Sequence, residues 1–182
     1  MSVGVIYFAE KLFHHRKSRE LKHHFHLPPY VNNRIKLIHS NWLSEHQKIL
    51  AFAPFDLIVS NPPYIAKTEQ PHLPLTVSKY EPSSALFGGD DGLDHFRKIS
   101  SQMVKHFQLL NPYFVIFEFG NNQSQHVKRI MLDNNPHLKL KEVIKEHNGD
   151  ERLIVFENTL RKRTDQASID DENQLVGTSI LL

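Results

Sequence analysis

Asn61-Pro62-Pro63-Tyr64 is the segment whose residue types and spacing could do chemistry. The side chain of Asn61 offers a carbonyl oxygen as a hydrogen-bond acceptor, and the backbone carbonyl of Pro62 offers a second acceptor. The two prolines stiffen the turn, so both acceptors are held in place before a ligand arrives. Tyr64 supplies a flat face that can pack on a planar amide or base. We call these four residues the clamp, and its chemistry suits a planar NH2 group.

A clamp of this kind suits methyl transfer to an amide or an exocyclic amine nitrogen. The lone pair of such a nitrogen is delocalised, so the site must accept its protons and hold it in line with the methyl donor. The bare tetrapeptide is also compatible with a plain strand-terminating turn. The buried run at residues 56–60 favours a functional site, because ligands of open α/β sheets bind beyond the carboxyl ends of strands.

The elements that must position the clamp alternate between strands and helices. Strand-like apolar runs lie at residues 3–8, 35–39, 55–60, 114–119, 138–145 and 152–156. Helices are predicted over residues 10–26, for about eighteen residues from Leu93, and over 124–132. Asn148-Gly149 is a hairpin signal between the last two strands. The pattern predicts an α/β fold with a mainly parallel sheet and a C-terminal antiparallel hairpin.

Residues 66–92 form a long excursion after the clamp. They contain six prolines or glycines and show little periodicity. An excursion of this length inside a compact domain indicates a functional loop more than a plain connector.

With these residues in view, the chain from about Arg34 to Glu157 resembles the catalytic domain of the HemK family. These protein-(glutamine-N5) methyltransferases modify the glutamine of the Gly-Gly-Gln motif in translation release factors. The matching motifs are the run Phe55–Ile65, then Tyr80-Glu81-Pro82, Ala85-Leu86, Gly88-Gly89-Asp90-Asp91-Gly92-Leu93 and Asn148-Gly149-Asp150-Glu151-Arg152. The resemblance implies a partial Rossmann-like class I S-adenosylmethionine-dependent methyltransferase domain. We therefore expect an undefined segment at 1–33, the methyltransferase-like domain at 34–158 and a flexible tail at 159–182.

The resemblance also implies roles for single residues. Asn61, Pro62 and Tyr64 are expected to be the catalytic groups. The substrate amide is expected to be bound by Asn61, Pro62, Pro63, Tyr64 and Glu81, although Glu81 could instead anchor the loop after the clamp. Glu118, at the end of a buried strand, could face the cofactor or cap a backbone amide, and the sequence favours the structural role.

S-adenosylmethionine is the cofactor that the resemblance implies, with Asn41, Trp42 and Asn61 as its expected contacts. Asn41 stands where the family usually has an aspartate that meets the adenine, and its side chain can still accept a hydrogen bond from the adenine amino group. The family's glycine-rich loop, of the Asp-x-Gly-x-Gly type, is missing. The seven glycines of this chain are at positions 4, 88, 89, 92, 120, 149 and 177.

The missing loop leaves the enzyme status open. In the family the loop follows a central first strand beside residues 55–60, and the loss of that strand would expose an apolar edge. Residues 3–8 could substitute as a strand. A truncated gene model, a shortened isoform and a degenerate paralogue are all compatible with the sequence.

Two further functions stay open beside glutamine methylation. Adenine-N6 methyltransferases carry the same tetrapeptide, because an adenine amino group needs the same two acceptors. A catalytically inactive fragment could retain a release-factor docking surface. The expected partner is a release factor, with nucleic acid as partner only in the adenine interpretation. We expect a monomer without membrane association, in a mitochondrion or the cytoplasm.

Composition excludes other chemistries. The chain has 182 residues, a net charge of +2 and no cysteine, which excludes disulfides, zinc–thiolate sites and cysteine nucleophiles. Its thirteen histidines lack the convergent spacing of metal ligands, so no metal site is predicted. The basic run Arg161-Lys162-Arg163 is expected to be solvated.

Overall fold

The computed structural model describes residues 5–7, 35–161 and 180–181 of the chain. The described strands form a sheet of seven in the order β2-β1-β7-β3-β4-β6-β5. Their bounds are β1 Val5–Tyr7, β2 Ile35–Leu37, β3 Leu57–Ser60, β4 Phe114–Glu118, β5 Leu138–Lys145, β6 Glu151–Asn158 and β7 Ile180–Leu181. The pairs from β2 through to β4 are parallel, and the pairs β4–β6 and β6–β5 are antiparallel. The predicted α/β class, the mainly parallel sheet and the C-terminal hairpin are confirmed.

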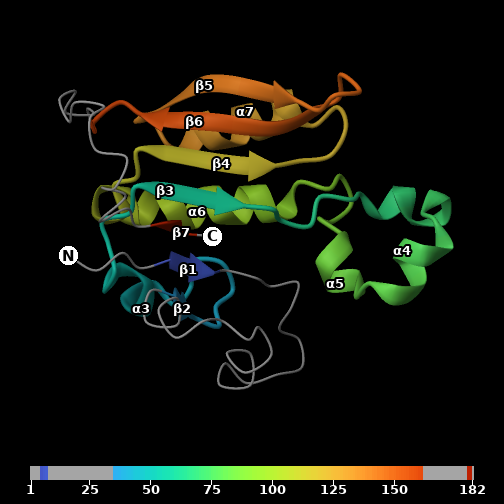
Figure 1. The fold of residues 1–182 in the computed structure, drawn as a ribbon, viewed down its shortest axis with the longest axis horizontal. Helices are drawn as coiled ribbons and strands as arrows, with labels where there is room; N and C mark the ends of the chain where they lie inside the picture. The colour runs from blue at the N-terminus through green and yellow to red at the C-terminus, as the bar shows by residue number, and fades with distance from the viewer. Residues whose placement is uncertain (1–4, 8–34, 162–179, 182) are drawn as a thin grey trace.

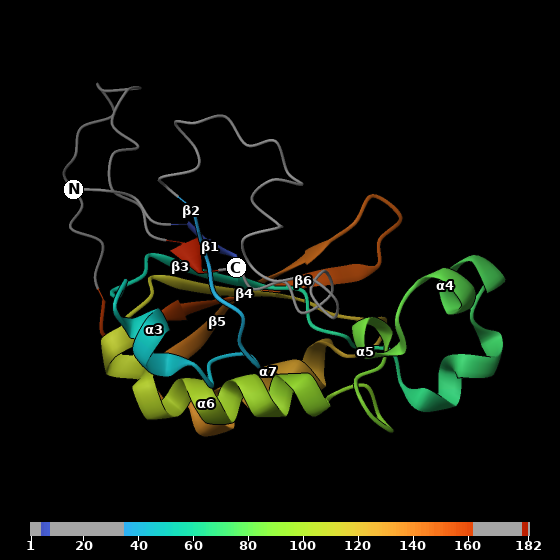
Figure 2. The same ribbon diagram turned by 90° about the horizontal axis from the view of Figure 1, so that it is seen from below.

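The helices α3 (His46–Leu50), α6 (Asp94–Leu110) and α7 (Ser124–Asn134) lie on one face of the sheet (Figure 2). The apolar stripe of α6 buries Phe96, Ile99, Met103 and Phe107 against the strands. This helix ends at Asn111, which has a left-handed φ of 41° and precedes a proline. The predicted helices near 93–110 and 124–132 are thereby confirmed.

The hairpin of β5 and β6 turns where the sequence predicts it. The amide N–H of Gly149 donates to the carbonyl of Glu146, and the N–H of Glu146 donates to the carbonyl of Asp150. Gly149 has a φ of 92°, a left-handed conformation that glycine adopts without steric cost. Among the described helices none is long and apolar enough to cross a membrane.

The excursion after the clamp is partly helical. It holds the short helices η2 (Lys67–His72), α4 (Leu75–Tyr80) and α5 (Ser83–Leu86), and it projects beyond the end of β3 (Figure 1). These helices, and α3, were not predicted, because each is too short to show an apolar period. The predicted helix over residues 10–26 lies outside the described residues.

The strand β7 takes the place in the sheet between β1 and β3. Ile180 pairs with both Val5 and Leu57, and Leu181 pairs with Ile6 and Ile58. The apolar edge of β3 expected from the missing first strand is therefore covered by residues from the predicted tail. Residues 3–8 do supply a strand, β1, but it is not the neighbour of β3, because β7 lies between them in the sheet. The three-part domain division stays a prediction, although the sheet draws strands from all three segments.

Arg161 corrects another expectation, since it is not a solvated member of a basic run. One guanidinium nitrogen donates to the carbonyls of Phe55 and Asn111, both at 2.6 Å, and the other donates to Asp56 at 2.8 Å. The guanidinium also lies 3.7 Å from the centre of the Tyr113 ring. Arg161 therefore ties the chain after β6 to the turn before β4 and to the start of β3.

Candidate functional site

The clamp lies at the carboxyl end of β3, beside the end of β4. Ser60 is in register with Phe117, so Asn61 and Glu118 follow at neighbouring positions of the two parallel strands. Pro62 and Pro63 are buried, Tyr64 is half-buried and Asn61 is exposed. The clamp thus presents its asparagine to solvent from a rigid, buried base.

Glu118 joins the two side chains of the clamp. Nδ2 of Asn61 donates to Oε2 of Glu118 at 2.7 Å, and the hydroxyl of Tyr64 donates to Oε1 at 3.2 Å. The sequence favours a structural role for Glu118, and the structure gives it one, but both carboxylate oxygens accept from side chains and not from the expected backbone amide. Neither Oδ1 of Asn61 nor the carbonyl of Pro62 accepts a hydrogen bond from a residue that the structure describes.

The surroundings of Tyr64 raise the pKa of its phenol. Burial of the ring is the main cause, and the negative charge of Glu118 adds to it, while the positive charge of Arg152 acts in the opposite direction. Arg152 is held by Oε1 of Glu146 at 3.0 Å and by the carbonyl of Phe119 at 3.2 Å. The phenol is therefore kept protonated and able to donate to Glu118.

Gln123, the residue before α7, braces the backbone of the clamp. Its Nε2 donates to the carbonyl of Tyr64 at 2.9 Å, and its Oε1 accepts from the N–H of Gly120 at 2.9 Å. The loop after β4 and the turn after β3 are thereby joined through one side-chain amide. Sequence reasoning assigned no role to Gln123 or Arg152 and missed the pairing of Glu118. The contact of Gln123 with Tyr64 and that of Glu118 with Asn61 join residues 59 and 57 positions apart.

Three glycines lie where the clamp leaves no room for a side chain. A Cβ at Gly88 would lie 2.6 Å from the carbonyl oxygen of Pro63, and one at Gly92 would lie 2.2 Å from the carbonyl oxygen of Tyr64. A Cβ at Gly120 would meet the Tyr64 ring at 2.9 Å. The spacing of these glycines is thus explained by close approach to the clamp.

The excursion returns to the clamp through backbone hydrogen bonds. The N–H of Ile65 donates to Leu86 at 3.0 Å, and the N–H of Gly88 donates to the carbonyl of Ile65 at 2.9 Å. Glu81, expected near the substrate, is exposed at the end of α4, and its side chain makes no hydrogen bond to the clamp. Its substrate role stays a prediction.

Asn41 and Trp42, the expected cofactor contacts, lie in the turn before α3, which is attached to α6. The indole N–H of Trp42 donates to Nδ1 of His95 at 3.2 Å, and the N–H of Leu43 donates to Oε1 of Gln102 at 2.8 Å. Trp42 is 7% exposed and belongs to the core, so its ring is not a free stacking surface. Asn41 is exposed, and its side chain is in none of the hydrogen bonds among described residues. The cofactor role of both residues stays a prediction.

The side of the site that would bind the methyl donor lacks the glycine loop that the resemblance implies. The sequence has no glycine between position 4 and position 88, the stretch that includes β1, β2 and β3. The strand β1 is therefore not followed closely by a glycine that could approach the methionine part of S-adenosylmethionine. The exposed side-chain amide of Asn41 is able to accept a hydrogen bond from an adenine amino group, whereas the segment after β1 has no glycine loop for the methionine part.

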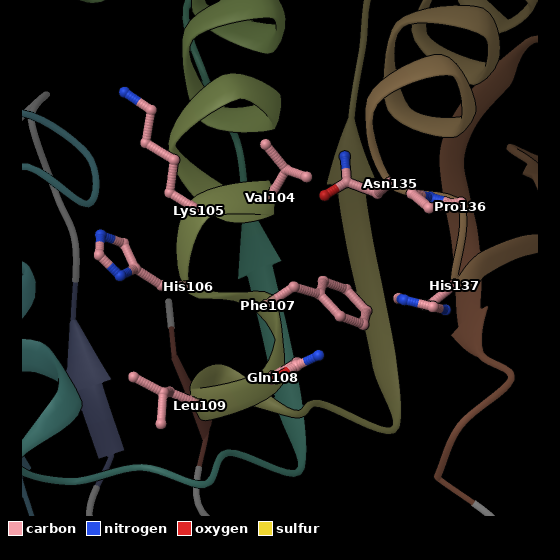
Figure 3. Close-up of a pocket in the computed structure, with 9 residues that line it drawn as sticks. All are labelled: Val104, Lys105, His106, Phe107, Gln108, Leu109, Asn135, Pro136 and His137. Carbon is pink, nitrogen blue, oxygen red and sulfur yellow. The ribbon is translucent and has the colours of Figure 1, made fainter.

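Two other features do not enter the site. A hollow of 440 Å³ lies between the last turns of α6 and the turn from α7 to β5, lined by residues such as Val104, Phe107, Asn135 and His137 (Figure 3). It is remote from the clamp, because the end of α6 meets the start of β3 through the Phe55 N–H and Leu110 carbonyl. In the part of the chain that the structure describes, no group of three histidines or acidic residues could hold a metal ion.

The fold and the clamp are those of a methyltransferase-like α/β domain, and comparison with known proteins agrees. The chain is 37% identical over 141 residues to a bifunctional methyltransferase of Rickettsia felis, covering 77% of this chain and 24% of that protein. It is 38% identical over 107 residues to a release factor glutamine methyltransferase of Fusobacterium nucleatum, covering 59% of this chain and 29% of that one. A release factor glutamine methyltransferase of Bacillus cereus is 37% identical over 102 residues, with coverages of 56% and 35%.

These relatives confirm the resemblance that the motifs predict. The chain spans between about a quarter and about a third of the length of the relatives given above. A crystal structure of a release factor-specific protein-(glutamine-N5) methyltransferase from Alicyclobacillus acidocaldarius has a TM-score of 0.40 and 20% sequence identity, over 68% of this chain and 64% of that chain. No family model matches the chain.

Proposed function

We propose that the clamp binds the side-chain amide of a glutamine that accepts a methyl group, in the Gly-Gly-Gln motif of a translation release factor. The observation that carries this proposal is a pair of acceptors at the end of β3, Oδ1 of Asn61 and the carbonyl of Pro62, to which none of the described residues donates. Relatives named release factor glutamine methyltransferases support glutamine as the acceptor. The proposal concerns this site and not the whole of those longer proteins.

The residues of the clamp would act on the acceptor nitrogen by position. An amide NH2 that donates one hydrogen bond to Asn61 and another to Pro62 has its plane fixed. Its nitrogen would then face the methyl donor. The ring of Tyr64 can pack on the planar amide. S-adenosylmethionine, when bound, supplies the electrophilic methyl group, and Asn41 is the residue proposed to accept a hydrogen bond from its adenine.

A second candidate function follows from the donor side of the site. Without a glycine turn after β1, the chain could bind the methyl acceptor and yet transfer nothing. Such a protein would keep a surface for a release factor without catalysis. The catalytic and the non-catalytic candidate differ in whether the protein binds S-adenosylmethionine. Both predict that it binds the glutamine-containing domain of a release factor.

The test measures the binding of the methyl donor and of the methyl acceptor separately. Calorimetry with S-adenosylmethionine and with a Gly-Gly-Gln domain gives the two affinities, and transfer of a labelled methyl group gives activity. We expect Asn61→Ala to abolish transfer while leaving the affinity for S-adenosylmethionine nearly unchanged. Acceptor binding without donor binding would favour the non-catalytic function. A fully active N61A variant, or transfer to an adenine oligonucleotide in preference to the glutamine domain, would contradict the proposal.

A further inference from the structure

Glu118 fixes which atom of the Asn61 amide faces the ligand. An ionised carboxylate can only accept hydrogen bonds, so the group that Asn61 turns toward it must be its NH2. The 2.7 Å contact from Nδ2 to Oε2 has this arrangement. Because an amide carries its oxygen opposite its nitrogen, Oδ1 must point away from Glu118.

A second contact holds the carboxylate itself. Oε1 of Glu118 accepts from the Tyr64 hydroxyl at 3.2 Å, which leaves Oε2 for Asn61. The raised pKa of Tyr64 keeps that hydroxyl a donor at neutral pH. Glu118 is half-buried and at the end of a central strand, so its position is set by the sheet.

The consequence is that the two groups that Asn61 and Pro62 offer to a ligand are both acceptors. A ligand that brings an NH2 group can satisfy both Oδ1 of Asn61 and the carbonyl of Pro62. An ionised carboxylate of the same shape has no proton to give and would set its oxygens against these two acceptors. A site built to receive NH donors rejects analogues that lack them far more strongly than an apolar pocket does.

We propose that Glu118 is a positioning residue that makes the clamp specific for an amide over a carboxylate, and so for glutamine over glutamate. The inference rests on the proposed function, because it assumes that a glutamine is the ligand. Without an acceptor at position 118, the exposed Asn61 side chain can turn over and present its NH2. The same clamp would then accept a carboxylate.

Two variants separate this orientation effect from simple repulsion between charges. Glu118→Leu removes both the charge and the acceptor, whereas Glu118→Gln removes the charge and keeps a carbonyl oxygen for Nδ2 of Asn61. The matched control is Glu146→Gln, which removes a carboxylate bound to the nearby Arg152 without a contact to the clamp. Glu118→Ala replaces the leucine variant if thermal unfolding shows that E118L does not fold.

The measurement is the affinity of the full chain for two release-factor domains, one with Gly-Gly-Gln and one with Gly-Gly-Glu. We expect the preference for glutamine to fall by about tenfold or more in E118L. It should stay within about threefold of the wild type in E118Q and E146Q, since these keep the acceptor. An unchanged preference in E118L, or an equal loss in E118Q and E118L, would overturn the inference.

A second readout does not need a bound ligand. The side-chain NH2 protons of Asn61, assigned by nuclear magnetic resonance through their loss in Asn61→Ala, should shift in E118L and much less in E118Q. If the wild type binds neither domain, the proposed function fails for this chain, and these protons still test the orientation. Resonances of Asn61 that are the same in E118L and the wild type would contradict the role of Glu118.

Discussion

The side-chain amide of Gln123 donates to the backbone carbonyl of Tyr64 at 2.9 Å, so the clamp is held from the loop that follows the neighbouring strand. The other end of the same amide accepts from the N–H of Gly120. Both hydrogen-bonding groups of this side chain are thus used to keep the end of β3 beside the end of β4. The brace therefore fixes the backbone of the clamp at Tyr64 relative to the loop after β4.

Replacing Gln123 with alanine should destabilise the protein by about 1–3 kcal/mol, because the Tyr64 carbonyl and the Gly120 N–H both lose their partner. Urea denaturation measures the loss. Gln125→Ala is the matched control, since Gln125 is exposed in the first turn of α7, and it should change the free energy of unfolding by less than about 0.5 kcal/mol. Equal effects of the two variants would show that the brace contributes nothing.

Replacing Gly92 with alanine should destabilise the protein more than the same change at Gly149. Both glycines have a left-handed φ, 78° and 92°, so both substitutions cost about 1 kcal/mol in backbone strain. Only at Gly92 does a Cβ also meet the carbonyl oxygen of Tyr64, at 2.2 Å, whereas nothing lies within 4 Å of a Cβ at Gly149. Urea denaturation of the two variants isolates the contact with the clamp. A G149A variant as unstable as G92A would refute the steric explanation.

Asp91 should make stability depend on pH in the acid range. The Arg97 guanidinium, and more weakly the N–H of Leu93, hold the pKa of this carboxyl at about 2, below its ordinary value of 3.8. A lowered pKa in the folded state means that the stabilisation is present above about pH 4 and is lost as the pH falls toward 2. The loss in Asp91→Asn at pH 7 should stay below about 1 kcal/mol, because the pair is half exposed.

Denaturation of wild type and D91N across pH 2 to 7 checks this expectation. The two curves should differ at pH 7 and approach each other toward pH 2, because Asp91 is then protonated in the unfolded state and about half protonated in the folded state of the wild type. Asp133→Asn, which breaks the exposed pair with Arg129, is the control and should change stability little at any pH. A difference between wild type and D91N that grows on acidification would contradict the assignment.

The sequence predicts those parts of the fold that have a local cause. The unbroken apolar centre of 57–59 indicates a buried strand, and Asn61-Pro62 ends it where the structure does. Asn148-Gly149 predicts the hairpin because its backbone conformation is a property of the two residues themselves. The clamp could be located in the same way, since all of its residues are adjacent in the chain.

The remainder depends on contacts that no local pattern reveals. Glu118 is 57 positions from Asn61, and Arg161 is 105 positions from Asp56, so neither pair leaves a period or a motif. Ile180–Leu181 is too short a run to predict a strand, and only the uncovered edge of β3 explains its place in the sheet. Sequence reasoning therefore finds the residues of the clamp and misses the side chains that hydrogen-bond to them.

The place of β7 also has a consequence for the order of folding. Ile180 pairs with Leu57 and Val5, so the contact that joins β1 and β2 to the other described strands closes a loop of more than 120 residues. Closing a long loop has an entropic cost before any contact repays it, and folding slows as contacts become less local. The β5–β6 hairpin and the β3–β4 pair can therefore form first. The clamp and α6 lie in the chain between β3 and β4 and can form with them. We expect the β1–β2 side of the sheet to dock in a later, slower phase.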